Sequence, residues 1–522
     1  MKKFKKLAAF AVASTMLVSC LAGCGEKQKK FELTDVSEGG TLIATEPAEV
    51  TFFYKQSEAA DGQWRMLNEA GKLTNVYAIP QVAKSVDFEQ EFGLMIGDPK
   101  NMPDIVETYD PTTLSQYGAQ GAFVKLNEYF DEYAPNIKAF LDENPDIKKR
   151  ITAYDGNIYY IPFIPGGHVS TAWFVRQDWL DKLNLSEPTT RDELYNVLKA
   201  FKEKDPNGNG QADEIPFFSS SKIKCLFPLW DANPDWYVEN GKVKYGPYEP
   251  EYKDAVKGIA QWYKEGLIDR EIYTRTDNPR EKMFADNIGG VTHDWVGSTA
   301  GFNTNENVLK NAPDFNIAAM APPASEAGKK GVELESRPIS SAYGWAINSN
   351  SANIEMIVRY FDFWFTEEGR RLMNFGIEGE HYDMVDGKPV FKAELLAQSD
   401  FKQKLAQEGV QMDIGYRQDF EYEKQWLTDD AVAAMELYEN GGFIKEQFPI
   451  LTMEFTPEEM EEYSNLKTQI TTRVDEMQQK WILGNSDIES EYDSYISDLD
   501  SLGMKRLLEI QQSAYERYNS QK

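Results

Sequence analysis

The sequence predicts an α/β protein with two or three packed lobes. The chain has 522 residues, of which 41% are hydrophobic and 27% charged, so it is globular and longer than one hydrophobic core usually serves. Strand-like and helix-like segments follow one another without a long linker, which favours lobes through which the chain passes more than once. No repeat of about 20–50 residues is visible, which argues against a solenoid or a propeller.

Short β-branched and aromatic segments mark the expected strands. Val50–Tyr54 is the first, and Met102–Val106 reads as a second, buried strand. Asp155-Gly156 predicts a turn that leads into Ile158–Ile161, and Asp386-Gly387 predicts a hairpin. These segments supply the strands that an α/β lobe needs.

Capping signals mark the expected helices. A capping box at Thr190 predicts a helix over residues 190–204, with apolar residues three or four apart on one face. Thr456, followed by proline and two glutamates, begins a long helix that ends at Gly484. Ser486 opens the next helix, so the C-terminal part of the chain is rich in helix.

The charge of the chain excludes one class of partner. Asp and Glu number 85 against 55 Lys and Arg, so the formal net charge is −30. Phosphate binding needs the opposite sign over its footprint, so a nucleic-acid partner is not expected. Beyond the first 25 residues, no stretch approaches the roughly 20 apolar residues that span a bilayer.

Residues 1–23 predict a secretory signal peptide. Four lysines precede an uncharged run that begins at Leu7 and ends in small residues. Leu21-Ala22-Gly23-Cys24 resembles the lipobox of bacterial lipoproteins, in which the cysteine is acylated and becomes the first mature residue. We therefore expect Cys24 to be acylated, with palmitate as the acyl group, and residues 24–40 to form a flexible tether. A signal anchor and plain secretion are the alternatives.

Cysteine usage agrees with export. The chain has Cys20, Cys24 and Cys225, so removal of the signal and lipidation of Cys24 leave Cys225 alone. A lone thiol cannot form an intramolecular disulfide. The apolar neighbours of Cys225 favour a small buried side chain over a reactive one.

The strongest chemical motif is the segment 205–216, which reads Asp-Pro-Asn-Gly-Asn-Gly-Gln-Ala-Asp-Glu-Ile-Pro. Oxygen-bearing side chains recur at alternate positions, and calcium prefers six to eight hard oxygen ligands around such a loop. Gly210 is at the sixth position, where a positive φ turns the chain. The candidate calcium ligands are Asp205, Asn207, Asn209, Gln211 through its carbonyl, Asp213 and Glu214.

The segment departs from an EF-hand at its end. Pro216 occupies the twelfth position in place of the bidentate glutamate, and the adjacent Asp213-Glu214 pair can supply that carboxylate instead. A single loop predicts a structural calcium ion rather than a signalling sensor. A polar loop without metal is the alternative.

No catalytic constellation is visible. The three histidines, His168, His293 and His381, are isolated from one another and from metal-binding motifs. No phosphate-binding loop occurs, and pairs of carboxylates are inevitable among 85 acids. The sequence therefore predicts a protein that is not an enzyme.

Aromatic residues offer candidate ligand contacts. The chain has 11 Trp, 27 Tyr and 29 Phe, and flat rings are platforms for the C–H faces of sugars. Most of these rings must be core. The candidates that lie in polar, glycine-rich or turn-like surroundings are Trp295, Trp426, Trp64, Tyr343 and Trp345.

The order of several motifs resembles the extracellular solute-binding lipoproteins (family 1) of bacterial ABC importers, in the subgroup of alginate-oligosaccharide-binding proteins. The matching segments are Asn144-Pro145, Asp155–Pro162, Arg176–Leu183, Pro188-Thr189 leading into 205–216, Gly376–Tyr382 and the helices from Trp481 to Tyr518. The loop motif in this context is the most specific of them.

The resemblance implies a two-lobed periplasmic-binding-protein-like (type II) fold, with the lobes joined by a hinge. It places residues 41–160 and 325–390 in the N-terminal lobe, and 161–324 and 391–522 in the C-terminal lobe. It also implies that the loop holds calcium as a structural brace. Trp295 and Trp426 match the family's aromatic platforms that stack on sugar rings, with Ser298 nearby.

The sequence therefore predicts a monomeric receptor, exported and lipid-anchored outside the cytoplasm. It would bind an oligosaccharide between two lobes and deliver it to the transmembrane subunits of an ABC permease. Two alternatives stay open. One is a receptor for another solute, such as a peptide or a modified metabolite, and the other is a secreted glycan hydrolase with a calcium brace.

Overall fold

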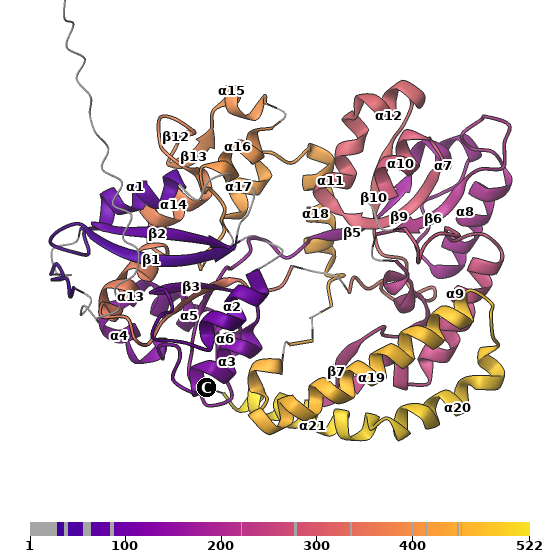
Figure 1. Ribbon diagram of the computed structural model, residues 1–522. Helices are drawn as coiled ribbons and strands as arrows, with labels where there is room; N and C mark the ends of the chain where they lie inside the picture. Colours follow the sequence, from indigo (N-terminus) through magenta and orange to yellow (C-terminus); the bar gives the residue numbers. More distant parts are fainter. Residues whose placement is uncertain are drawn as a thin grey trace, which may run out of the picture.

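The computed structural model shows two lobes side by side, each built around its own sheet (Figure 1). The structure describes residues 29–35, 40–55, 64–83, 88–220, 222–275, 279–334, 337–398, 400–412, 415–445, 448–449 and 451–521. The predicted signal peptide, Cys20 and Cys24 lie outside these ranges. Residues 29–35 of the predicted flexible tether are instead packed on the first lobe: the Phe31 amide donates to Asn353 Oδ1 at 3.0 Å, and Leu33 pairs with Ala44.

The first lobe contains a five-stranded mixed sheet in the order β2-β1-β3-β11-β4. Its strands are β1 (Ala48–Lys55), β2 (Val76–Ala83), β3 (Ile105–Thr108), β4 (Ile161–Pro162) and β11 (Gly344–Ile347). β1 pairs in parallel with β2 and β3, whereas β11 is antiparallel to β3 and β4. The sheet is therefore completed by a strand from the second half of the chain.

Helices and a small hairpin cover this sheet. The helices are α1 (Arg65–Thr74), α2 (Phe88–Ile96), α3 (Pro111–Ala119), α4 (Phe130–Tyr133), α5 (Pro135–Glu143), α6 (Pro145–Ile151), α13 (Ile354–Phe363), α14 (Glu367–Phe375), α15 (Ala393–Leu396), α16 (Phe401–Gln407) and α17 (Phe420–Lys424). The hairpin is β12 (Tyr382–Val385) and β13 (Lys388–Phe391). Trp345 lies at the centre of the core, where its ring stacks on Tyr360 with a centroid distance of 5.7 Å.

The second lobe contains a four-stranded sheet in the order β10-β5-β9-β6. The strands are β5 (Thr171–Arg176), β6 (Ile215–Ser219), β9 (Gly289–Trp295) and β10 (Ile317–Met320). β6 and β9 are parallel, while β5 is antiparallel to both of its neighbours, β9 and β10. The amino end of β5 therefore lies beside the carboxyl end of β9, at Trp295.

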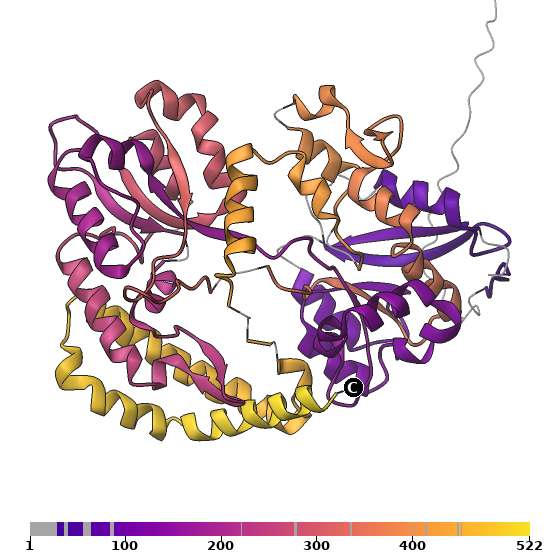
Figure 2. The same ribbon diagram turned by 180° about the vertical axis from the view of Figure 1, so that it is seen from behind.

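Helices also surround the second sheet. They are α7 (Gln177–Leu183), α8 (Arg191–Glu203), α9 (Glu251–Lys264), α10 (Pro279–Ala285), α11 (Val296–Ala300), α12 (Glu306–Asn311) and α18 (Asp429–Gly441), with a hairpin of β7 (Trp236–Glu239) and β8 (Lys242–Tyr245). Three long C-terminal helices, α19 (Pro457–Ile482), α20 (Ile488–Ser501) and α21 (Met504–Ser520), run along the lower side of this lobe toward the first lobe (Figures 1 and 2).

Most of the predicted elements are present. The first strand, the hairpin at Asp386-Gly387 and the helix after Thr190 occur as expected, and Thr456 forms a complete capping box. Two details differ. Asp487 rather than Ser486 caps α20, because its carboxylate accepts the Glu489 amide at 3.1 Å.

The sheets and cores differ from the predicted lobe boundaries at two places. The predicted second-lobe range 161–324 begins with Ile161 and Pro162, which form β4 of the first-lobe sheet, and Ile164 is buried in the core of the first lobe.

Residues 391–422 were assigned to the second lobe, yet Phe391, Leu405 and Tyr422 are buried in the core of the first. Phe391 packs against Phe375 of α14, with ring centroids 5.3 Å apart. The return to the second lobe comes later, between α17 and α18.

One arginine ties together three segments that run between the lobes. The Arg337 backbone amide donates to His168 O at 3.0 Å, and its side chain donates to Val169 O at 3.1 Å and Gly166 O at 2.7 Å. The same guanidinium forms a forked ion pair with Glu423 of α17. We call this set of contacts the hinge clasp.

We predict that Arg337→Gln destabilises the protein strongly. Glu423 is buried, and without Arg337 its charge would lose its hydrogen-bonded ion-pair partner, which typically costs about 3–5 kcal/mol. Urea unfolding followed by tryptophan fluorescence should show this loss. Lys424→Gln, which removes an exposed pair with Glu421 and a contact with the Phe420 ring, is the matched control and should change stability by less than about 0.5 kcal/mol. Equal midpoints for the two variants would show that the clasp is dispensable.

Candidate ligand cleft and cation sites

A large cavity lies between the lobes. Its volume is about 1730 Å³, above the roughly 300–1,000 Å³ of pockets for drug-sized ligands, so it has room for an extended solute. The first lobe contributes residues of α5, α6 and α14, and the second contributes residues 224–238, β9 and α18. A solute held here would touch both lobes at once.

A buried polar cluster forms part of the cavity wall in the second lobe. His293 Nε2 lies 3.0 Å from both carboxylate oxygens of Glu333, and Thr171 Oγ1 donates to Glu333 at 3.0 Å. Burial alone would lower the pKa of His293, but Glu333 and Cys225 raise this pKa well above its usual value. The contact with Glu333 therefore favours the protonated form of His293. Cys225 is buried beside it, as predicted.

Trp426, where the chain passes from α17 to α18, lies beside the segment that follows Trp295. Trp295 ends β9 with 54% of its surface exposed. A Cβ placed on the nearby Gly297 would lie 3.9 Å from the Trp426 ring. Ser298 is exposed on the same turn, and its Oγ accepts a hydrogen bond from Arg280 at 2.7 Å. We call Trp295, Ser298 and Trp426 the aromatic corner.

One face of Trp426 already has a cation on it. Lys402 Nζ lies 4.0 Å from the centroid of the Trp426 ring. Burial lowers the pKa of Lys402, and the facing Glu423 opposes this effect. A sugar that stacked on this face would displace the ammonium group or contact it.

Tyr343 is exposed at the start of β11, whereas Trp64 and Trp345 are core residues. Trp64 packs edge-on against Tyr54, with centroids 4.6 Å apart. The glycine beside Trp345 does not mark a ligand-facing turn. Gly344 belongs to β11 and pairs with Pro162 of β4. A Cβ on Gly344 would lie 2.2 Å from Ile161 O. Trp64 and Trp345 therefore present no face to a ligand.

None of the six predicted ligand residues is among the described residues that line the cavity. Sequence reasoning also missed the basic residues that do line it, among them Arg150, Arg370 and Arg417. Isolated arginines carry no pattern that separates a cavity wall from an exposed surface. The candidate ligand region thus has two parts, the cavity and the aromatic corner.

The loop at residues 205–216 lies between α8 and β6 and folds around its own acidic side chains. Asp205 accepts the Asn209 amide at 3.1 Å and the Gly210 amide at 2.9 Å. The side-chain amides of Asn207 and Asn209 both donate to Asp213, each at 3.0 Å at the nearest. Gly210 has the positive φ that the motif requires, at 76°. The oxygen-bearing side chains therefore converge.

Glu214 adds a carboxylate that lacks a partner. Both of its oxygens are buried and make no hydrogen bond of normal geometry. The backbone amides of Glu214 and Asn207 stabilise the charged carboxylate only partly. Burial first, and then the charges of Asp213 and Asp205, raise the pKa of Glu214. A bound cation would remove this repulsion, so the residues fit a hard divalent ion such as calcium.

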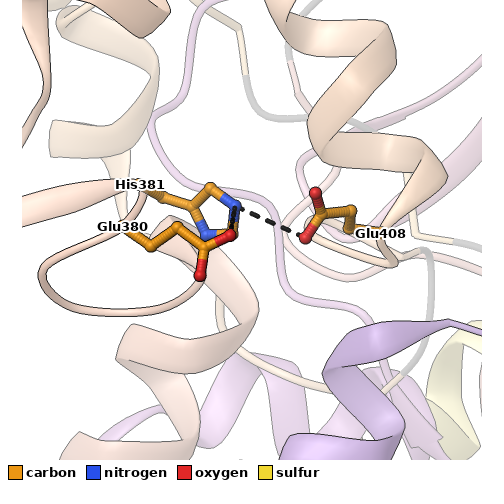
Figure 3. A group of neighbouring side chains, drawn as sticks. All are labelled: Glu380, His381 and Glu408. Carbon is orange, nitrogen blue, oxygen red and sulfur yellow. Dashed lines mark ion pairs between the residues drawn. The ribbon is translucent and has the colours of Figure 1, made fainter.

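A second acidic group, Glu380, His381 and Glu408, also brings possible metal ligands within 4.8 Å of one another (Figure 3). Arg65 occupies this group instead, with its guanidinium 2.5 and 2.7 Å from Glu380 and 3.2 Å from Glu408. His381 Nδ1 accepts the Ile377 amide at 2.9 Å, so the ring proton is on Nε2, which faces Glu408 at 3.4 Å. A protonated nitrogen cannot bind a metal, and the group is an ion-pair network.

Within the described residues, no helix combines the length and the apolar character needed to cross a membrane.

Comparison with known proteins defines the class of this protein. Residues 79–371, more than half of the chain, match the family described as bacterial extracellular solute-binding protein. The chain belongs to this family. Its two-lobed α/β fold, with a cavity between the lobes, agrees with that assignment.

Individual relatives extend over nearly the whole chain. The fructooligosaccharide ABC transporter substrate-binding protein FusA of Streptococcus pneumoniae serotype 4 is 27% identical over all of both chains. The polygalacturonan/rhamnogalacturonan-binding protein YtcQ of Bacillus subtilis strain 168 is 25% identical over 95% of this chain and 96% of its own. The crystal structure of the alginate-binding protein AlgQ2 without calcium ion is 38% identical, with a TM-score of 0.75, and covers 91% of this chain and 99% of its own.

Proposed function

We propose that this protein is a lipid-anchored receptor of an ABC importer that captures an oligosaccharide and delivers it to the permease. The observation that carries the proposal is the cavity of about 1730 Å³ with walls from both lobes. Relatives that span the chain, among them FusA and YtcQ, are described as binding proteins for carbohydrates. The receptor would act as a monomer and pass its solute on chemically unchanged.

The aromatic corner supports a carbohydrate over other solutes. Trp295 exposes a large ring, and Trp426 lies beside the same turn. Such rings bind the apolar C–H faces of sugars, while hydroxyl groups such as that of Ser298 bind sugar hydroxyls. Tyr343, exposed just before β11 where its carbonyl accepts the Phe163 amide, is a further candidate contact.

Capture would proceed by closure of the lobes about the hinge clasp. Contacts to both cavity walls form together only when the lobes approach each other, so the solute favours the closed state by its extra contacts there. The clasp holds the crossing segments in register during this motion.

The loop at residues 205–216 would hold a structural calcium ion. Its ligands would be Asp205, Asn207, Asn209, the Gln211 carbonyl, Asp213 and Glu214. The unpartnered carboxylate of Glu214 supports this assignment. The ion would neutralise the crowded acids and fix the connection from α8 to β6.

We predict that Trp295→Ala and Trp426→Ala each weaken oligosaccharide binding by about 5- to 30-fold, because each removes a stacking platform. Isothermal titration against a panel of oligosaccharides measures the effect. Leu94→Ala, which shortens an apolar side chain that is 72% exposed on the first lobe, is the control. Titration curves that match the wild type for both tryptophan variants would remove the aromatic corner from the site. Binding of peptides but of no glycan would overturn the proposed solute class.

We predict that EDTA lowers the melting temperature and that added calcium restores it, with about 2.7 kcal/mol of stabilisation at a calcium concentration 100 times Kd. Glu214→Gln should abolish this response. In EDTA the variant should melt no lower than the wild type, because the substitution relieves the repulsion at Glu214. Glu203→Gln, at the end of α8, is the control and should keep the calcium response. A melting temperature indifferent to EDTA and to calcium would contradict the site.

We predict that Cys24 is the site of lipid attachment. Cells expressing the full chain should incorporate labelled palmitate and retain the protein in the membrane fraction. Cys24→Ser should lose the label and release the protein, whereas Cys20→Ser should behave as the wild type. Equal labelling of the Cys24→Ser variant would place the anchor elsewhere.

A further inference from the structure

A buried arginine of α10 contacts the turn that carries Trp295 and Ser298. This turn joins β9 to α11, and Arg280 is the second residue of α10. Arg280 is only 4% exposed, and its Nε lies 3.3 Å from Oδ2 of Asp294, which is 1% exposed. Because a buried charge that loses its partner is strongly destabilising, Arg280 and Asp294 act as one unit within the second lobe.

The same guanidinium holds the turn by further contacts. Its Nη1 donates to Ser298 Oγ at 2.7 Å and to Thr299 Oγ1 at 2.8 Å. It also donates to Trp295 O at 3.4 Å. On the other side of the same residue, Asp294 Oδ1 accepts the Trp295 amide at 2.8 Å. The Arg280–Asp294 pair therefore binds both the amide and the carbonyl of Trp295.

The local sequence gives this turn little support of its own. Trp295 occupies the N-cap position of α11, and an indole N–H cannot accept the amides of the first helical turn. The helix has only five residues, so it depends on packing rather than on its own hydrogen bonds. The direction of the exposed Trp295 ring thus depends on tertiary contacts, of which the buried Arg280–Asp294 pair is the charged one.

The contact with Arg280 also decides how Ser298 can bond to a solute. A guanidinium group only donates, so Ser298 Oγ is the acceptor in this hydrogen bond and keeps its own proton for another partner. Ser298 is exposed, so that partner can be an oxygen atom of the solute. A hydrogen bond from a charged donor also polarises the hydroxyl group, which makes it a stronger donor.

We infer that Arg280 is a positioning residue for solute binding, which orients the Trp295 ring and makes Ser298 a hydrogen-bond donor toward the solute. The inference rests on the proposed carbohydrate function and on the aromatic corner, and it adds a residue that acts through these side chains. The solute atom that Ser298 recognises would be an acceptor, such as a ring, glycosidic or hydroxyl oxygen of a sugar.

Arg280→Gln combined with Asp294→Asn tests the inference. The two substitutions remove both charges together, and the asparagine can still accept the Trp295 amide. A panel of oligosaccharides from maltotriose to trigalacturonate first selects the sugar that binds the wild type most tightly. Isothermal titration with that sugar should show an affinity about 5- to 30-fold lower for the charge-free variant. Urea unfolding of the same sample shows whether it is folded.

A second variant covers the case in which the charge-free variant does not fold. Arg280→Lys keeps a positive charge beside Asp294, but its single nitrogen cannot also reach Ser298 and Thr299 as the guanidinium fork does. It should therefore bind the same sugar more weakly than the wild type. Wild-type affinity in this variant would overturn the inference.

Arg275→Gln combined with Asp269→Asn is the matched control. Asp269 is 4% exposed, pairs with Arg275 at 2.6 Å and accepts the Glu271 amide at 3.0 Å. Its own amide donates to Phe217 O of β6, so this pair lies at the edge of the same sheet. The control should lose stability and keep the sugar affinity of the wild type. An equal loss of affinity in the control would mean general destabilisation and would overturn the inference.

The charge-free variant is then repeated in a background with Trp295→Ala and Ser298→Ala. Because Arg280 acts through these two side chains, the further loss of affinity there should be less than about threefold. A larger loss in this background, or a loss of less than about threefold in the wild-type background, overturns the inference and leaves the carbohydrate function standing. If no sugar of the panel binds the wild type, the carbohydrate function itself is overturned, and the inference with it.

Discussion

The hinge clasp is the contact on which the arrangement of the lobes depends. The chain passes between the lobes in segments that are far apart in sequence, and backbone pairing alone holds them together only in part. A single planar guanidinium donates to two carbonyls of the segment before β5, Gly166 and Val169, and to the carboxylate of Glu423 on α17. Because its donors are fixed in one plane, Arg337 sets the spacing of these segments as well as their charge balance.

This constraint explains how recognition can be divided between the lobes. The first lobe contributes α6 and α14 to the cavity, while the second contributes the His293–Glu333 pair. His293 Nε2 lies 3.0 Å from Glu333, and Thr171 donates to the same carboxylate, so these buried groups already have partners within the second lobe. In the first-lobe part of the wall, Arg150, Arg370 and Arg417 make no salt bridge with a described residue. The two walls therefore differ in what they can offer a solute, even though both are rich in charged groups.

The sequence predicted local features well and the cavity poorly. Caps, turns and the loop at residues 205–216 depend on neighbours in the chain. The sequence therefore predicted the helix caps at Thr190 and Thr456 and the positive φ of Gly210. The return of residues 391–422 to the first lobe depends on long-range packing, which no local pattern records. The same holds for Trp345 and Trp64, since a ring at a sheet centre and a ring at a binding surface have similar neighbours in sequence.

The chain makes one more link between the lobes beyond the crossing segments. The short helix η6 (Leu451–Glu454) packs on α3 and α6 of the first lobe, although Leu451 belongs to the core of the second. Near it, the Gln521 side chain reaches Thr152 O at 3.5 Å. The C-terminal region thus acts as a mechanical stop on the side away from the hinge. The lobes cannot move apart without breaking this contact. The contact therefore limits how far the cleft can open on the side opposite the hinge.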